Sequence, residues 1–406
     1  MLEHLAPGLL SWASDLDEAT RAQALMTARH PALAGHVALM PDAHLGIGAT
    51  IGTVIATEAA VIPSAVGVDI GCGMAAVEFG LQALHLPDSL DAIVDRWRER
   101  IPAGVGRGHA DALDRGFAAF LADHPFPGHP SHVQRAAAQF GSLASGNHFL
   151  ELCVDERQAT WVVLHSGSRG IGNQMAQAAI KDAKRVCRQW DITLEDPELA
   201  YFVQGTPEFD AYLRQLRWAQ AYAAANRALL LDLATAAVRD VLAAAHGLVA
   251  LPAVAAPINC HHNYAEMEAH GGRNLWITRK GAIRARVGDF GIIPGSMGAA
   301  TYIVTGRGNP ASYQSCSHGA GRRMSRTQAR REITPETLRA AMGSRAWLAE
   351  SAADLVDEAP GAYKDIEQVM RDQADRVDVV HVLHQVANFT GVEAERRRPM
   401  TAAPNR

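Results

Sequence analysis

The stretch TWVVLHSGSRGIGNQ, residues 160–174, joins a β-rich segment to a helical one through a short loop that contains glycine. Its apolar run ends at His165 and is typical of a core strand. Gly167 and Gly170 then interrupt the pattern, and Arg169 leads into a helix. We therefore expect a polar loop where a core strand gives way to a helix, and this unit indicates how the rest of the chain is organised.

Further β-rich segments recur along the chain, each bounded by Gly, Pro, Asn or Asp. They lie at residues 36–40, 52–57, 74–79, 274–287 and 300–306. Longer helical patterns separate them. The longest spans 206–247, where Thr206 is the expected N-cap and Pro207 the first helical residue. The pattern predicts an α+β fold, with a β-rich core of packed sheets surrounded by helices.

The domain organisation follows from the same patterns. The chain has 406 residues and shows no internal repeat, which argues against a solenoid or a propeller. We predict a single catalytic domain over residues 1–391, with helical insertions at about 87–139 and 175–247. Residues 392–406 are polar and are predicted to form a flexible tail.

The composition limits the function classes. Hydrophobic residues make up 48% of the chain and charged residues 20%, which is typical of a soluble globular protein. A net charge of −5 argues against a protein that coats nucleic acid nonspecifically. Residues 322–331, RRMSRTQARR, remain a candidate for a local basic groove, and a solvated helix face is the simpler interpretation.

The five cysteines are scattered without a CxxC pair, which argues against a disulfide framework or a zinc ribbon. The first residues lack the pattern of a secretory signal, and Gly247 and Pro252 interrupt the most apolar stretch. We therefore expect reduced cysteines, no membrane span and a cytoplasmic location.

Five polar loops combine metal-binding side chains with small residues. Taken singly, each histidine is more commonly a structural or surface residue, but one carboxylate, one thiol and three imidazoles on such loops favour a metal site. This donor set suits manganese, iron, cobalt or zinc better than calcium. The loops supply Asp42 and His44; Asp69 and Cys72; Asn147, His148 and Glu151; His165 and Arg169; and His261, His262 and Asn263.

A sixth motif, SCSHGAG at residues 315–321, places His318 among hydroxyls, a thiol and glycines. From the residues alone, His318 is a nucleophile, a metal ligand or a polar residue in a turn. The chain has no GxxxxGK[ST] loop, no GxSxG elbow and no dinucleotide fingerprint, so neither a P-loop nor a Rossmann fold is expected. It also lacks the Lys-x-Asp-Gly signature of most ATP-dependent nucleic-acid ligases.

Taken together, these motifs resemble the RtcB-type RNA ligases, which join RNA ends with GTP and manganese, and the likeness is greatest to the bacterial branch. The resemblance covers most of the chain. It rests on MPDAHLGIGATIGTVIAT (40–57), VGVDIGCGM (66–74), SGNHFLEL (145–152), LHSGSRGIGN (164–173), INCHHNY (258–264), TRKGA (278–282), GIIPGSMGAATYIV (291–304), CSHGAGRRMSR (316–326) and AYKDI (362–366).

The resemblance implies a role for each matching residue. His318 would be the nucleophile that forms a histidine–GMP intermediate. Two manganese ions would be bound by Asp69, Cys72, His148, His165 and His262, with Cys72 bridging them. GTP would be held by Asn147, Glu151, Asn263, Ser296, Thr301, Gly319, Ala320, Gly321 and Thr390. RNA or phosphate would contact Arg169, Arg279, Lys280, Arg322 and Arg326.

The implied reaction joins a 3′-phosphate or 2′,3′-cyclic phosphate end to a 5′-hydroxyl end, in RNA repair or tRNA splicing. Whether an activating protein is required stays open. Two alternatives remain: a metal-dependent phosphodiesterase or phosphatase acting on RNA ends, and a noncatalytic paralogue that binds metal and RNA.

One position departs from the family pattern. Many members end near Val-Lys-Gly, with a lysine that contacts the guanine base, whereas this chain has Thr390 at the corresponding place. A threonine hydroxyl lacks the charge and the reach of lysine. Either the tail arginines at 396–398 compensate, or this chain uses nucleotides with weaker or altered base selectivity.

Overall fold

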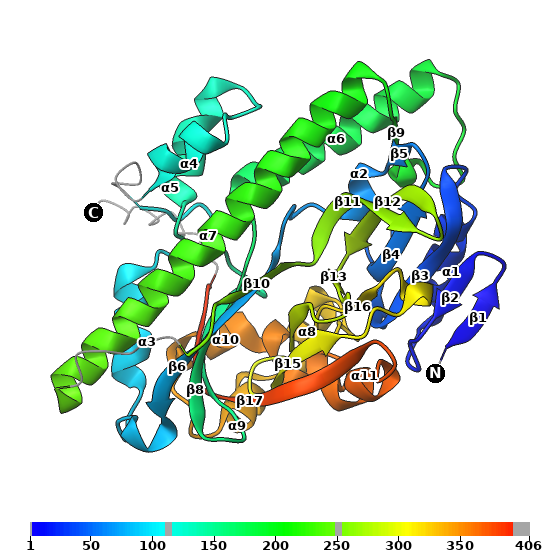
Figure 1. Cartoon of the computed structure of the whole chain (residues 1–406). Coiled ribbons are helices and arrows are strands. Elements are labelled where there is room, and N and C mark those ends of the chain that lie inside the picture. Colours follow the sequence, from blue (N-terminus) through cyan, green and yellow to red (C-terminus); the bar gives the residue numbers. More distant parts are fainter. Residues whose placement is uncertain (1, 110–115, 248–253, 393–406) are drawn as a thin grey trace, which may run out of the picture.

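The computed structural model describes residues 2–109, 116–247 and 254–392. Within these residues, two large sheets lie side by side and helices cover them (Figure 1). The first sheet has the order β1-β2-β3-β4-β12-β11, and its pairs are antiparallel except β2 with β3. Its strands are β1 (Glu3–Ala6), β2 (Leu9–Ser11), β3 (Leu33–His44), β4 (Ile51–Thr57), β12 (Arg273–Lys280) and β11 (Asn263–His270).

The second sheet has seven strands in the described part of the chain, all antiparallel, in the order β10-β6-β8-β7-β17-β15-β14. They are β10 (Ile258–His261), β6 (Gly73–Gln82), β8 (Ala159–Ser166), β7 (Phe149–Val154), β17 (Val377–Thr390), β15 (Thr301–Gly306) and β14 (Phe290–Pro294). Two short ladders complete the strands: β13 (Ala282–Arg284) with β16 (Ser315–Ser317), and β5 (Ala60–Val61) with β9 (Phe202–Val203).

The helices pack around these sheets, and the long helix α7 runs diagonally across the molecule beside α6 (Figure 1). Thr206 caps α7 by accepting a hydrogen bond from the amide of Phe209, and Gly247 ends it with a φ of 68°. The helices are α1 (Glu18–Ala28), α2 (Pro63–Val66), α3 (Asp91–Arg100), α4 (Phe117–Asp123), α5 (Val133–Gln139), α6 (Arg169–Gln189), α7 (Pro207–His246), α8 (Arg326–Glu332), α9 (Pro335–Met342), α10 (Ala352–Leu355) and α11 (Ile366–Asp372).

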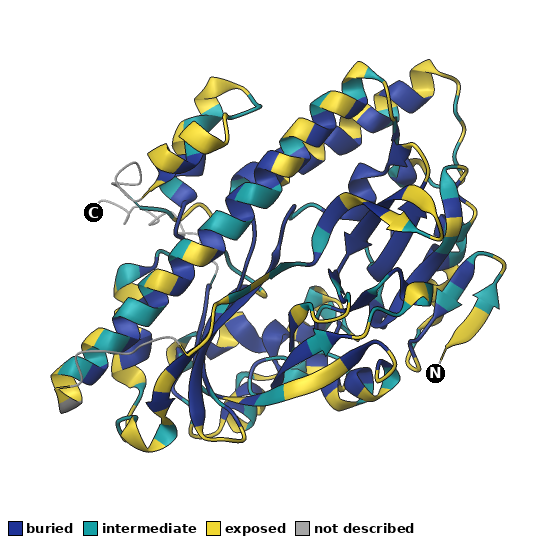
Figure 2. Cartoon of the chain, viewed as in Figure 1, coloured by how far each residue is buried: buried dark blue, intermediate teal, exposed yellow. Residues whose placement is uncertain are grey.

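The central strands β6, β8 and β7 of the seven-stranded sheet are buried on both faces, and they are dark in Figure 2. Alternate residues of β6 point to opposite faces. Val77 packs in one cluster with Leu230 of α7, and Met74 packs in another with Ile303 of β15. Burial on both faces explains why β8 is apolar along nearly its whole length rather than alternating.

The fold confirms the predicted α+β class. Each predicted β-rich segment forms a strand, and the segment at 274–287 forms two, β12 and β13. The predicted N-cap at Thr206 is confirmed. The region 87–139 contains α3, α4 and α5, although residues 110–115 lie outside the described residues, and α6 begins at Arg169, where a helix was expected. Most of the predicted tail, residues 393–406 with the arginines at 396–398, also lies outside them.

Candidate metal centre and its pocket

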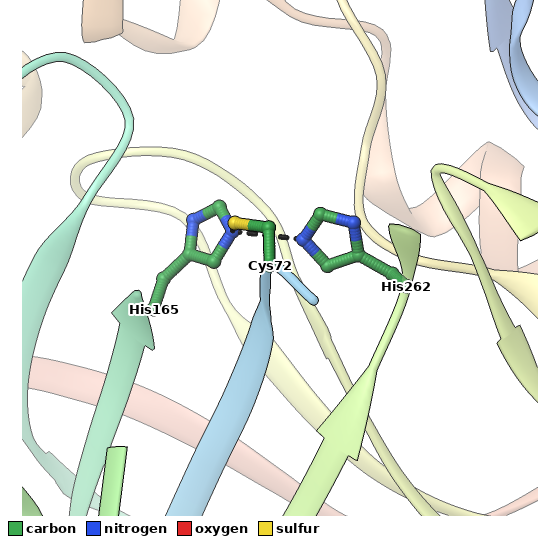
Figure 3. A group of neighbouring side chains, drawn as sticks. All are labelled: Cys72, His165 and His262. Atoms are coloured by element: carbon green, nitrogen blue, oxygen red, sulfur yellow. Dashed lines mark hydrogen bonds between the residues drawn. The ribbon is translucent and has the colours of Figure 1, made fainter. Parts of the chain in front are cut away.

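Five side chains predicted as metal ligands converge at one end of the seven-stranded sheet. Cys72 Sγ lies 3.2 Å from both His148 Nε2 and His165 Nε2, and His165 Nε2 lies 2.9 Å from His262 Nε2. Asp69 Oδ2 lies 3.1 Å from His148 Nε2. In Figure 3 the Cys72 thiol is next to the imidazole of His165, and that of His262 faces them from another strand end. Two overlapping groups, Asp69–Cys72–His148 and Cys72–His165–His262, could each hold a metal ion.

The strand order explains why these residues meet. β10, β6, β8 and β7 are consecutive neighbours in the sheet. Cys72, His148, His165 and His262 each lie on or next to an end of one of them, and Asp69 lies in the loop before β6. His165 is paired with Met74 of β6 and with Phe149 of β7, so the residues before both strands lie beside it. His262 is the one residue between β10 and β11, which places it where the two large sheets meet.

The protonation states of the cluster fit a metal site. Burial, aided by the charge of Asp69, raises the pKa of the Cys72 thiol well above its ordinary value. Burial also lowers the pKa of His165 and His262, so both imidazoles are neutral. Two neutral ring nitrogens 2.9 Å apart share at most one proton, which leaves a lone pair directed into the cluster. Lone pairs from sulfur, nitrogen and oxygen suit a borderline divalent cation.

The N-terminus of α6 binds a carboxylate of the protein. The backbone amide and the hydroxyl of Ser168 donate to Asp69 Oδ1 at 3.1 and 3.3 Å. Arg169, which we predicted as a phosphate contact here, has a φ of 60° and is buried. Its guanidinium donates to Ser142 Oγ at 3.0 Å and to two backbone carbonyls instead. The anion at this helix start is therefore Asp69.

Arg227 of α7 lies behind the cluster and was not predicted as a site residue. It is fully buried, and its guanidinium donates to the backbone carbonyls of Gly71 and Ser166 at 2.7 and 3.0 Å. Gly71 precedes Cys72 and Ser166 follows His165. Arg227 therefore ties the backbone next to two of the candidate ligands to the long helix.

His318 lies beside the cluster and is oriented by Asp42. Its ring centroid is 4.7 Å from that of His262. Its Nδ1 donates to Asp42 Oδ2 at 2.6 Å, and the same oxygen accepts the amides of His318 and Gly319 at 3.0 and 3.3 Å. Burial opposes ionisation of Asp42, but the charge of His318 and its hydrogen bonds lower the pKa of this carboxyl below its ordinary value. In the neutral form of the ring, a carboxylate that binds the proton on Nδ1 leaves the lone pair on Nε2.

From the sequence, Asp42 was expected only as a potential metal ligand. The structure makes it the partner of a histidine 276 residues later. The close fit also explains Gly321, because a Cβ there would lie 2.2 Å from the backbone oxygen of Asp42.

A cavity of about 400 Å³ contains the cluster and His318. Most of the predicted nucleotide-binding residues line it: Asn147, Glu151, Asn263, Ser296, Gly319, Ala320, Gly321 and Thr390. Lys280, Arg322 and Arg326 line it as well. Thr301, Arg169 and Arg279 do not, so the structure separates these three predicted site residues from the pocket.

The side chains outside the pocket have other surroundings. Arg279 is fully buried, forms an ion pair with Glu268 and donates to Ser315 Oγ at 2.9 Å. Thr301 is buried in β15, where it is paired with Leu383 of β17. Sequence alone could not separate these residues from the predicted site, because the partners Glu268, Ser315 and Leu383 are brought to them by the pairing of strands and by a loop.

The basic residues of the pocket are already paired with protein groups. Arg322 donates to Glu358 Oε1 at 2.7 Å, and Arg326 donates to Asp357 and Glu358 at 3.0 Å. The side chain of Arg326 is 42% exposed and that of Arg322 15%, so Arg326 is the more accessible cation. The interpretation of residues 322–331 as only a solvated helix face is therefore incomplete, since Arg322 and Arg326 face the pocket.

Converging metal donors beside an oriented imidazole, in a pocket of nucleotide size, define an enzyme site of the metal-dependent kind. The family model described as tRNA-splicing ligase RtcB matches residues 23–391. The chain is 41% identical over 392 residues to RNA-splicing ligase RtcB of Escherichia coli strain K12, covering 91% of this chain and 94% of the relative. It is 33% identical over 411 residues to RNA-splicing ligase RtcB of Mycobacterium tuberculosis, covering 82% and 90%.

The chain therefore belongs to the tRNA-splicing ligase RtcB family, and it is an enzyme of the ligase class. The resemblance drawn from its motifs is confirmed. No helix among the described residues is long and apolar enough to cross a membrane. All five cysteines lie in the described part of the chain and are free.

Proposed function

We propose that this chain is a GTP- and manganese-dependent RNA ligase that joins 3′-phosphate or 2′,3′-cyclic phosphate ends to 5′-hydroxyl ends. The observation that carries the proposal is the Asp42–His318 pair: Asp42 binds Nδ1 of a histidine that lines the same pocket as the candidate metal donors, so Nε2 is the ring nitrogen left for a substrate. Such an imidazole is a good nucleophile for a phosphoryl group. The names of the relatives, RNA-splicing and tRNA-splicing ligase, support RNA as the substrate.

In the first step, His318 Nε2 attacks the α-phosphorus of GTP. An N–P bond forms, the bond from the α-phosphorus to the bridging oxygen breaks, and pyrophosphate leaves. Asp42 holds the Nδ1 proton throughout and stabilises the positive charge that develops on the ring. Asp69, Cys72, His148, His165 and His262 would hold the manganese ions, which neutralise charge on the phosphoryl oxygens and polarise them.

The later steps use the same pocket. Water opens a cyclic phosphate to a 3′-phosphate. An oxygen of that phosphate attacks the phosphorus of histidine–GMP, which breaks the N–P bond and frees His318. The 5′-hydroxyl then attacks the 3′-phosphorus of the activated end, GMP leaves, and the hydroxyl proton passes to solvent. Arg322 and Arg326, which line the pocket, would contact the phosphates.

The experiment that tests this proposal is intact-protein mass spectrometry of the full chain after incubation with GTP and manganese, run in parallel with ATP. We expect a GMP adduct that is lost when model RNA ends are added, with a joined RNA as the product. Folded, metal-loaded protein that forms no nucleotide adduct would contradict the proposal. Hydrolysis of RNA ends without GTP would favour the phosphodiesterase alternative, and RNA binding without either reaction would favour the noncatalytic one.

Asp42→Asn is expected to slow adduct formation by about 10³-fold, because the amide keeps the shape of the acceptor but loses the charge that fixes the imidazole tautomer. Single-turnover adduct formation measures the rate. Metal content and the melting temperature should stay close to those of the unchanged protein. An unaltered rate would show that Asp42 only supports the loop.

We propose that the guanine base lies at the end of the pocket formed by Glu151 and Thr390. Glu151 is 2% exposed, its Oε1 accepts from Asn388 Nδ2 at 3.1 Å, and Thr390 Oγ1 donates to Asn388 Oδ1 at 2.8 Å. Phe149 and Met297 line the same pocket and offer apolar contacts for a base. Burial raises the pKa of Glu151 to about 8, so this carboxyl group is mostly protonated at neutral pH.

This pKa predicts a pH-dependent choice of base. As the pH rises through about 8, Glu151 becomes a carboxylate that accepts the N1–H and amino hydrogens of guanine, whereas the protonated acid below that pH matches the N1 and amino groups of adenine. The ratio of kcat/KM for GTP over ATP in adduct formation should therefore rise about 10-fold between about pH 7 and pH 9. Taking the ratio cancels pH effects on metal binding.

Two variants check the assignment. Glu151→Gln should make the ratio independent of pH, because an amide does not ionise. Thr390→Lys should raise the ratio at neutral pH, because an ammonium group lowers the pKa of a nearby carboxyl. A pH-dependent ratio in Glu151→Gln would assign the effect to another group.

Three further expectations stay predictions: the single domain over residues 1–391, the cytoplasmic location, and a role in RNA repair or tRNA splicing.

A further inference from the structure

The loop between β3 and β4 presents two apolar side chains at the pocket. Leu45 and Ile47 are 55% and 68% exposed, yet both line the cavity that contains His318 and the candidate metal ligands. Isolated exposed apolar residues are common on protein surfaces and need no explanation. These two differ from that background because the loop that carries them is held in place by specific polar contacts.

Gln23 and Lys280 hold the loop. Gln23 forms two hydrogen bonds with Gly46, one to its oxygen at 2.6 Å and one from its amide at 3.0 Å. Lys280 donates to the backbone oxygens of Ile47 and Ala49 at 2.6 and 2.8 Å. Lys280 is only 6% exposed, and burying an ammonium group is costly. Its three carbonyl acceptors, the third of which is that of Ser64, offset this cost and fix the position of the loop.

The structure leaves no room for a side chain at Gly46 or Gly48 of the loop. A Cβ at Gly46 would lie 2.6 Å from the oxygen of Ala49. Gly48 has a φ of 70°, and a Cβ there would lie 2.7 Å from Ser64 Oγ. The backbone of the loop thus packs closely against the protein, while the side chains of Leu45 and Ile47 are exposed to solvent. We call these two side chains the apolar lip.

The position of the lip indicates what it contacts. His44 precedes Leu45, and its ring lies parallel to that of His318 with the centroids 6.5 Å apart. An RNA end that reaches His318 therefore comes close to the lip. Arg322 and Arg326 in the same pocket match the phosphates of a strand, and the faces of nucleobases are apolar. A stable protein interface needs about 20 to 30 residues a side, far more than two side chains supply.

We propose that Leu45 and Ile47 form a seat for the terminal nucleobase of an RNA strand at the mouth of the pocket. The inference rests on the proposed RNA-joining function and adds a substrate contact to it. Either strand could supply the base, because the 3′-phosphate end and the 5′-hydroxyl end both approach His318. Apolar contact with a base face distinguishes poorly between the four bases, which suits an enzyme that joins ends of varied sequence.

The test compares Leu45→Ser/Ile47→Ser with Leu84→Ser, a matched control in which a leucine 79% exposed and outside the pocket is changed in the same way. The full chain is loaded with manganese and GTP. In sealing assays the 3′-phosphate and 5′-hydroxyl oligonucleotides are varied separately. We expect KM for one or both to rise about 10-fold in the double variant and not in the control, with adduct formation changed less than about 2-fold.

Oligonucleotides with an abasic terminal nucleotide provide a second arm. In the unchanged protein, the abasic nucleotide should raise KM by the same factor as the double substitution raises KM for the normal oligonucleotide. The double variant should have the same KM for the abasic and the normal oligonucleotide. The strand for which this holds is the one seated on the lip. Additive losses would show that the lip and the base act independently and would overturn the proposal.

Failure of the lip and failure of ligation are distinguishable. Binding of a labelled 3′-phosphate or 5′-hydroxyl oligonucleotide is measured by fluorescence anisotropy without GTP. Suppose that the unchanged protein forms no adduct, but the double variant binds either RNA end about 10-fold more weakly than the unchanged protein does. This result would support the apolar lip as an RNA contact and contradict the proposed ligase mechanism. Equal RNA binding and equal KM in the double variant and the control would overturn the lip, as would a slowed adduct step with unaltered RNA affinity.

Discussion

His318→Ala is expected to take up no GMP, while its fold and its metal content stay unchanged. The expectation follows from the geometry: Nδ1 of His318 is held by Asp42 at 2.6 Å, and five other side chains already supply the metal donors. Removing the ring removes the attacking nitrogen and leaves those donors in place. Intact-protein mass spectrometry with GTP and manganese measures the adduct, and elemental analysis measures the metal.

The control for this variant is His85→Ala, which removes an exposed histidine outside the pocket and should form the adduct normally. An adduct in His318→Ala would assign the nucleophile to another residue. Loss of metal together with the adduct would mean that His318 is a ligand, the second of the roles that the sequence left open.

Cys72→Ala is expected to lose both metal and activity. Among the described residues its thiol is the one donor within 3.2 Å of two imidazoles, His148 and His165, and it belongs to both candidate metal groups of this pocket. Removing it should weaken manganese binding by about 10²-fold or more, since even residues that only support a ligand contribute 10- to 100-fold. Competition with a chelator measures the affinity, and the adduct assay measures the activity.

Cys187→Ala is the matched control, because Cys187 is also buried and free but lies in α6 outside the pocket. The unchanged protein should bind manganese more tightly as the pH rises, since burial raises the pKa of the Cys72 thiol and a metal must displace its proton. Full metal retention in Cys72→Ala would remove this cysteine from the ligand set.

The parts of the fold that could be predicted are those that depend on residues close together in the sequence. Thr206 and Pro207 predict the start of α7, and the apolar run before His165 predicts β8, because helix capping and strand burial depend on the local sequence. β17 was not among the predicted strands, although it lies between β7 and β15 in the sheet. Its burial alternates irregularly along fourteen residues, with register shifts against both neighbours, so its periodicity is weak.

The candidate site likewise has a part that the sequence predicts and a part that only the structure shows. Candidate donors could be found because each lies on a polar loop with glycine or at a strand end, and the resemblance assigned them together. The pairing of Asp42 with His318 could not be found, since the strand order brings them together from opposite parts of the chain. Arg169 and Arg279 show the opposite difficulty: each has a basic side chain beside a site motif, and only the three-dimensional contacts show that protein groups already bind it.

The late position of β17 has a consequence for synthesis. The candidate metal donors lie between residues 69 and 262, the proposed nucleophile His318 follows, and the strand that lies between β7 and β15 ends at Thr390. A growing polypeptide thus displays its thiol and imidazoles well before the central sheet can close. A chain that ends before Val377 would leave the edges of β7 and β15 unpaired. The candidate site is therefore enclosed only after β17 has been synthesised.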